Sequence, residues 1–175
     1  EIYQNFWGDG LALPDFPDLP TYQIEDYTAM QRYHVEIWCE KSTMNDVLLP
    51  LCQRYGVNLQ TGAGELSITS CLELTHRATT RPARILYVSD FDPAGQSMPL
   101  AVSRKVEFFQ RTAGSAADIR LYPVVLLADQ VRQYRLPRTP LKESEKRGAR
   151  FEERYGEGAV ELLSLIHISE PTRPY

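Results

Sequence analysis

The chain has 175 residues and a net charge of −4, with 43% hydrophobic and 24% charged residues. This composition is ordinary for a soluble globular protein, and no apolar run approaches the roughly 18 residues that a membrane span needs. Length and composition therefore predict one principal domain with its own core and exclude a membrane-spanning chain.

The two ends of the sequence differ from its middle. Residues 1–32 are rich in Pro, Gly and Asp, which predicts an irregular connection, and the chain begins at Glu1 without a Met. We therefore expect a piece of a longer protein with a domain upstream. Residues 163–175 resemble a translated sequencing adaptor, so we expect an artefactual tail and leave it out of the fold prediction.

Apolar patterning first predicts a strand and a helix. Residues 33–39 are β-branched and aromatic, which is typical of a strand, and residues 44–55 carry apolar side chains at helical spacing. Ser42 or Thr43 is expected to cap this helix, and Pro50 is expected to bend it.

Further strands and helices alternate along the chain. A near-continuous apolar run such as residues 83–90 is typical of a strand that is buried on both faces. In the strand at residues 119–128, Pro123 indicates a sheet edge or a bulge. The other expected elements are a short strand with a glycine turn (57–64) and helices at 65–77 and 98–109.

This alternation predicts an α/β fold, with a mostly parallel sheet of about four strands and helices on both faces. The core is expected at residues 33–128, followed by a basic helical extension at 129–162. In such sheets, the working site lies beyond the carboxyl ends of the strands.

Three carboxylates follow two of the expected strands. Glu40 follows the first strand, while Asp90 and Asp92 follow the third and lie on the same side of an extended chain. Mg²⁺ prefers such oxygen ligands, so the pattern indicates a metal site. The alternative is structural: Asp-Pro-Ala-Gly is a good turn sequence, and Asp92 can simply cap the next helix.

Charge is distributed unevenly along the sequence. Residues 1–30 contain six acids and no Lys or Arg, whereas residues 130–155 contain eight bases against four acids. A basic stripe of this kind can contact a phosphate backbone, although a solvated helix face is the simpler explanation. The candidate phosphate contacts are Arg132, Arg135, Arg138, Lys142, Lys146 and Arg147.

The cysteines and histidines indicate no zinc site. Cys39, Cys52 and Cys71 form no C-x-x-C pair and lie in apolar patterns, so we expect buried free thiols in a reducing, cytoplasmic compartment. The three histidines are scattered along the sequence.

Three motifs together resemble the Toprim domain of topoisomerases, primases and certain nucleases. They are VEIWCEK (35–41), TGAG (61–64) and YVSDFDPAG (87–95), and their form is most similar to that of the topoisomerase VI A subunit and its meiotic double-strand-break relatives. The resemblance covers about residues 33–127 and implies a Rossmann-like catalytic domain that cleaves or transesterifies DNA with Mg²⁺ or Mn²⁺.

The resemblance assigns roles only to matching positions. It implies that Asp90 and Asp92 bind the metal, that Glu40 supports the metal or acts in general acid–base catalysis, and that Lys41 pairs with a phosphate or a carboxylate. Gly62 and Gly64 match a turn where a bare backbone lets DNA approach. DNA is the implied partner, and a homodimer or an ATPase subunit is an alternative protein partner.

One departure from the family and two rival explanations leave alternatives open. No upstream winged helix with an attacking tyrosine is present, so the nucleophile is either a tyrosine outside this sequence or water. A haloacid-dehalogenase-like phosphatase would use Asp90 as nucleophile, but Ala94 stands where that motif has Thr or Val. A DNA-binding scaffold without catalysis is the remaining alternative.

Overall fold

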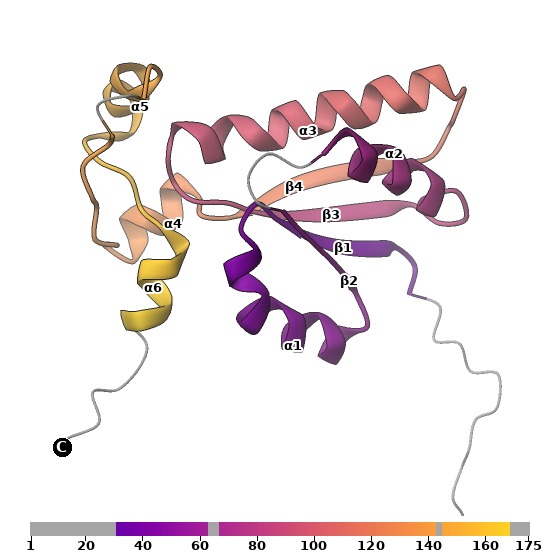
Figure 1. The fold of residues 1–175 in the computed structure, drawn as a ribbon, viewed down its shortest axis with the longest axis horizontal. Helices are drawn as coiled ribbons and strands as arrows, with labels where there is room; N and C mark the ends of the chain where they lie inside the picture. The colour runs from indigo at the N-terminus through magenta and orange to yellow at the C-terminus, as the bar shows by residue number, and fades with distance from the viewer. Residues whose placement is uncertain (1–30, 63–66, 143–144, 169–175) are drawn as a thin grey trace, which may run out of the picture. The chain divides into compact units, whose positions relative to one another are not determined.

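The protein is built on a four-stranded parallel sheet, in the order β2-β1-β3-β4 (Figure 1). The computed structural model describes residues 31–62, 67–142 and 145–168, so the expectations for residues 1–30 and for Gly64 lie outside it. All three neighbouring strand pairs are parallel, which confirms the predicted α/β, Rossmann-like sheet. The strands are β1 (His34–Cys39), β2 (Asn58–Thr61), β3 (Ala83–Val88) and β4 (Ile119–Val125).

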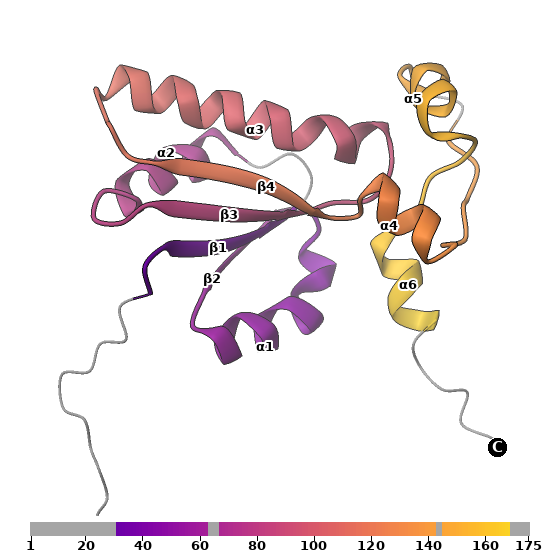
Figure 2. The ribbon, with the colours of Figure 1, turned by 180° about the vertical axis from the view of Figure 1, so that it is seen from behind.

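Helices cover both faces of the sheet, as predicted (Figures 1 and 2). Helix α1 (Asn45–Tyr55) lies on one face, and helices α2 (Ile68–Arg77) and α3 (Pro93–Thr112) lie on the other. Helix α1 runs on past Pro50 and ends at Gly56, whose φ of 60° is the left-handed conformation that favours glycine. In the described ranges, no helix is both long enough and apolar enough to cross a membrane.

Successive side chains of the central strands point to opposite faces of the sheet, and each face has its own apolar core. Ile37, Cys39 and Val88 face one core, which also contains Leu48 and Cys52 of α1. The opposite core holds Trp38, Ile85 and Tyr87 of the sheet with Cys71 and Leu74 of α2 and Val102 and Val106 of α3. The three cysteines are buried thiols that form no disulfide, as expected.

The predicted cap of the first helix is wrong. Ser42 and Thr43 belong to a short 3₁₀ turn, η1 (Ser42–Met44), and Met44 precedes α1 without a capping side-chain bond. The reason lies in the neighbouring loop, because the Ser42 N–H donates to the Gly62 carbonyl at 3.0 Å and so holds this residue against the end of β2.

The edge strand β4 carries the irregularity that Pro123 predicts. Tyr87 of β3 pairs with Pro123, but its neighbour Val88 pairs with Val125, so Val124 is an extra residue in the ladder. Proline has no N–H to donate, and a bulged edge strand tolerates that loss. Both expectations for this strand are confirmed.

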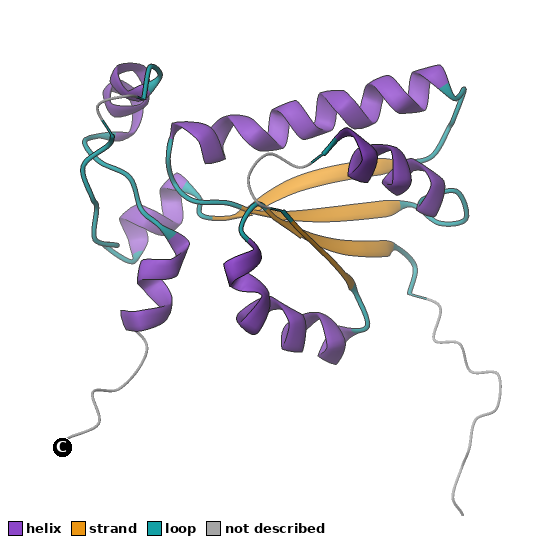
Figure 3. Cartoon of the chain, in the orientation of Figure 1, coloured by secondary structure: helices purple, strands orange, loops and turns teal. Residues whose placement is uncertain are grey.

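The extension after the sheet is only partly helical (Figure 3). It contains α4 (Ala128–Gln133), α5 (Gly148–Tyr155) and the start of α6 (Leu162–Ile168), but two antiparallel bridges, Phe91 to Val160 and Thr139 to Ala159, lie between them. Phe151, Val160 and Leu162 enter the same core as α1. The extension therefore shares the core of the sheet.

Candidate active site

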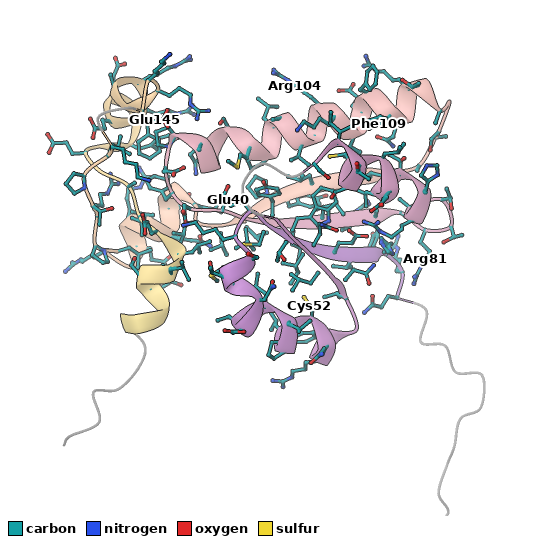
Figure 4. All side chains as sticks on the ribbon, in the orientation of Figure 1. Glu40, Cys52, Arg81, Arg104, Phe109 and Glu145 are labelled. Atoms are coloured by element: carbon teal, nitrogen blue, oxygen red, sulfur yellow. The ribbon has the colours of Figure 1, made fainter. Side chains whose placement is uncertain are left out.

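The predicted site residues meet at the carboxyl ends of β1 and β3. Glu40 and Lys41 directly follow β1, and Asp90 and Asp92 lie just beyond β3, its parallel neighbour. All four side chains line one pocket of about 300 Å³. Figure 4 shows Glu40 at this end of the sheet. The sequence therefore predicted correctly that these four residues come together.

Both carboxylate oxygens of Asp90 are engaged. Lys41 forms an ion pair with Oδ2, and the backbone N–H of Leu162 donates to Oδ1 at 2.9 Å. Asp90 is buried, so these two partners compensate for the water that its charge has lost. The extension thus supplies one of the two groups that hold Asp90.

Asp92 begins helix α3, as the structural alternative predicted. Its Oδ1 accepts the N–H of Gly95 at 2.6 Å, and Pro93 occupies the first helical position, where a missing N–H is tolerated. The Asp-Pro-Ala-Gly sequence is therefore a helix start. Asp92 nevertheless also lines the pocket, so the cap and a role in the site are compatible.

Gly95 permits a close approach between α3 and the strand end. A Cβ at this position would lie 2.1 Å from the backbone oxygen of Asp90 and 3.2 Å from Cβ of Ser89. Only glycine fits without moving the backbone that carries Asp90. Gly95 is thus a site-shaping residue whose role in the motif is steric.

Glu40 is the least satisfied carboxylate of the site. It is only 6% exposed, and its Oε2 is buried without a hydrogen-bond partner among the described residues. Burial raises the pKa of Glu40 to about 7, and the charges of Asp90 and Asp92 act in the same direction. Such a group is close to half-protonated at neutral pH and can give or take a proton.

Lys41 is the cation closest to these acids. Burial works to lower the pKa of Lys41, but the hydrogen bond and charge of Asp90, helped by Glu161 and Glu40, outweigh it and raise the pKa. The ammonium group therefore stays charged and neutralises part of the acidic pocket.

The extension supplies the opposite wall of the pocket. It contributes two acids that the sequence analysis missed, Glu145 and Glu161, together with Lys142. Glu145 is bound by Arg147, and Glu161 directly precedes the residue whose N–H holds Asp90. No local signal could reveal these acids, because they reach the site through contacts between distant segments, such as the pairing of Val160 with Phe91.

Phe91 anchors this wall to the acidic loop. Its backbone exchanges hydrogen bonds with Val160 at 2.9 and 3.0 Å, and its ring packs edge-on against Phe151 and Tyr155. The Arg138 guanidinium lies over the same ring and donates to the carbonyls of residues 156 and 157. The central residue of Asp-Phe-Asp is therefore a packing residue.

The predicted basic stripe is not a uniform surface. Of its six members, only Lys142 lines the acidic pocket. Arg132 pairs with Asp129, Arg138 holds the 156–158 turn, and Arg147 pairs with Glu145 and donates to Ser97 at 2.7 Å. Arg135 has a positive φ of 49° just after α4, and Lys146 lies in an exposed turn before α5.

Gly62 also has a local role. Its N–H donates to Cys39 at 3.1 Å and its carbonyl accepts from Ser42, so this glycine links the ends of β1 and β2. The predicted approach of DNA to its backbone stays a prediction.

The side chains of the pocket determine how a divalent ion can fit there. In the part of the chain that the structure describes, no three His, Cys, Asp or Glu side chains form a group ready to hold a metal. Both carboxylate oxygens of Asp90 are already occupied, one by Lys41 and the other by the N–H of Leu162. The unpartnered Glu40 Oε2 in a pocket with Asp92 still offers hard oxygen ligands of the kind Mg²⁺ takes.

Comparisons with known proteins add no relative. No family model, no curated protein and no solved structure matches the chain.

Proposed function

We propose that the protein is a Toprim-type, Mg²⁺-dependent enzyme that cleaves or transesterifies phosphodiester bonds in DNA. The single observation that supports this proposal is the buried, unpartnered Oε2 of Glu40 in a pocket shared with Lys41, Asp90 and Asp92. Burying an unsatisfied carboxylate costs stability, and such sites commonly serve a function.

The charge of the pocket supports a cation cofactor. Five acids (Glu40, Asp90, Asp92, Glu145 and Glu161) line it against two lysines (Lys41 and Lys142). A DNA phosphate would be repelled by this excess unless bound cations compensate it. Asp90 and Asp92, with support from Glu40, would hold Mg²⁺, which would stabilise the negative charge that develops on the scissile phosphate.

The protein's own residues would share the remaining tasks. Glu40, whose pKa is raised to about 7 while the site holds no metal ion, would give up its proton as the ion binds. Lys142, on the extension side, would pair with a non-bridging phosphate oxygen, and Lys41 would stay charged within the same pocket. The attacking group would be water, or a tyrosine supplied from outside this sequence.

A nicking assay on supercoiled plasmid tests the proposal. Wild-type protein with Mg²⁺ or Mn²⁺ should convert the plasmid to nicked or linear DNA, and Asp92→Asn should abolish this. The matched control is Asp129→Asn, which removes an exposed acid paired with Arg132 outside the pocket. Equal cleavage by all three proteins, or no divalent-ion binding by the wild type in calorimetry, would refute the proposal.

A non-catalytic DNA-binding scaffold is the second candidate. The Lys41–Asp90 ion pair favours it, because the pair satisfies Asp90 without a metal. A scaffold should bind DNA equally well with and without Mn²⁺, and Asp92→Asn should leave that affinity unchanged.

A phosphatase with Asp90 as its nucleophile is disfavoured. Its carboxylate is buried, with one oxygen bound to Lys41 and the other to Leu162. Neither oxygen is poised to attack an incoming phosphate.

A further inference from the structure

The acidic pocket already binds one cation, the ammonium group of Lys41. This group forms an ion pair with Asp90 Oδ2 and lines the same pocket as Glu40 and Glu161. A divalent ion that takes Asp90 Oδ2 as a ligand would repel this ammonium, because two cations that share one oxygen lie within a few ångström of each other. The displaced ammonium then needs another acceptor in a partly buried place.

Glu161 is placed to be that acceptor. The N–H of Leu162 donates to Asp90 Oδ1 at 2.9 Å, which fixes the backbone of Glu161 beside Asp90. The pairing of Val160 with Phe91 fixes the same segment from the other side. The charge of Glu161 also acts on Lys41, where it helps to raise the pKa of the ammonium group.

The other acids of the pocket are less suited to receive Lys41. Glu145 is bound by Arg147, and Asp92 caps helix α3 through Oδ1. Glu40 is at least nine-tenths buried, with an unpartnered Oε2, so it is itself the ligand that an incoming ion would use. Glu161 is exposed and its side chain makes no ion pair among the described residues, so it can accept the ammonium at little cost in desolvation.

We propose that Glu161 is a positioning residue that accepts the Lys41 ammonium when a divalent cation binds Asp90. This inference rests on the proposed metal-dependent function and adds how the site changes from its ion-paired state to its metal-bound state.

Mn²⁺ binding measured by calorimetry and by electron paramagnetic resonance tests the exchange without any assay of activity. Glu161→Gln should weaken Mn²⁺ binding about 10-fold, because Lys41 loses its second acceptor and stays on Asp90. In a Lys41→Gln background, where no ammonium must move, Glu161→Gln should change the affinity less than about 2-fold. Glu157→Gln is the matched control, because Glu157 belongs to the same segment but lines a different pocket.

A second measurement covers the case in which Lys41→Gln fails to fold. In wild-type protein with ¹³C-labelled lysine, the Cε signal of Lys41 should shift on addition of Mg²⁺ and should shift differently in Glu161→Gln. Three outcomes would each overturn the inference. They are equal Mn²⁺ affinity of wild type and Glu161→Gln, an equal loss of Mn²⁺ affinity in the wild-type and Lys41→Gln backgrounds, and a Lys41 signal that does not shift. If wild-type protein binds no Mn²⁺, the proposed function fails as well, whereas binding that Asp92→Asn removes and Glu161→Gln spares overturns only the inference.

Discussion

The backbone N–H of Leu162 holds Asp90 Oδ1 at 2.9 Å, although the two residues lie 72 positions apart in the chain. The bond ties the acidic loop after β3 to the far end of the extension. The candidate site is therefore a joint product of the sheet and the extension, and variants in either part should affect it.

Two substitutions of Asp92 should separate its role as a helix cap from its role in the site. Asn is as good a helix cap as Asp, so Asp92→Asn should keep the unfolding free energy within about 0.5 kcal/mol, whereas Asp92→Ala should lose about 1 kcal/mol. Both variants should lose Mn²⁺ binding because both remove the carboxylate charge. Urea unfolding and calorimetry measure the two effects, and full Mn²⁺ affinity in Asp92→Asn would contradict the assignment.

Glu40 should make stability fall as pH rises. Its pKa is raised from 4.5 to about 7 in the folded protein, so between these values the folded state binds more protons than the unfolded state. Without divalent ions, the unfolding free energy should decrease by about 3 kcal/mol from pH 4.5 to 7, and Glu40→Gln should remove that decrease. Chemical denaturation across this range checks it, and identical pH profiles would show that Glu40 is not held in this state.

Glu36 should have the opposite effect at acidic pH. Burial works to raise its pKa, but hydrogen bonds from Arg77, Trp38 and His34 outweigh that effect and lower the pKa to about 2. Stability from this carboxylate is present above pH 4.5 and should be lost, by about 3 kcal/mol, as pH falls towards 2. Unfolding of Glu36→Gln should lack this loss.

The matched control for Glu36 is Glu73→Gln. Glu73 is exposed and meets the same Arg77 at 3.7 Å, so its loss should change stability by less than about 1 kcal/mol. A similar effect of the two variants would mean that the burial of Glu36 is unimportant.

Gly95 should tolerate no side chain. A Cβ 2.1 Å from the Asp90 oxygen forces the backbone apart, so Gly95→Ala should destabilise by about 2 kcal/mol or more and abolish Mn²⁺ binding. Gly114→Ala is the control, because its φ of 62° is unfavourable for alanine but its Cβ would meet nothing within 4 Å. We expect that variant to lose about 1 kcal/mol with intact Mn²⁺ binding. Thermal melts and calorimetry distinguish the two.

The basic residues should divide into two groups. Arg138 holds backbone carbonyls and packs over Phe91, so Arg138→Gln should lower stability. Lys142 lines the pocket, so Lys142→Gln should instead weaken DNA binding and reduce its salt slope by about 1. DNA titrations at several salt concentrations check this, and an unchanged slope would remove Lys142 from the interface.

Periodicity predicted the sheet well because each strand has a local signature. The run at residues 83–90 became β3, and its alternating faces serve two cores. Residues 40, 41, 90 and 92 could be placed together because parallel strands end at one edge of a sheet. The Ser42 or Thr43 cap failed because a bond between loops, from Ser42 to Gly62, decided the local conformation.

Contacts between distant segments could not be predicted from the sequence. Glu145 and Glu161 reach the pocket through isolated bridges and ring packing, which leave no periodic pattern. Some partners of the arginines were hidden for the same reason. Charge counts along the chain predicted a stripe, but contacts such as the hydrogen bond from Arg147 to Ser97 were decided by the three-dimensional fold.

The bridge between Phe91 and Val160 has a consequence for the order of folding. Strands β1 and β3 pair across less than 50 residues, whereas the bridge closes a loop of nearly 70 and so costs more chain entropy. During synthesis, the sheet residues also leave the ribosome before residue 160 does. We therefore expect the parallel sheet to assemble first and Asp90 to gain its final partner last, so that a newly made chain is folded before its site is complete.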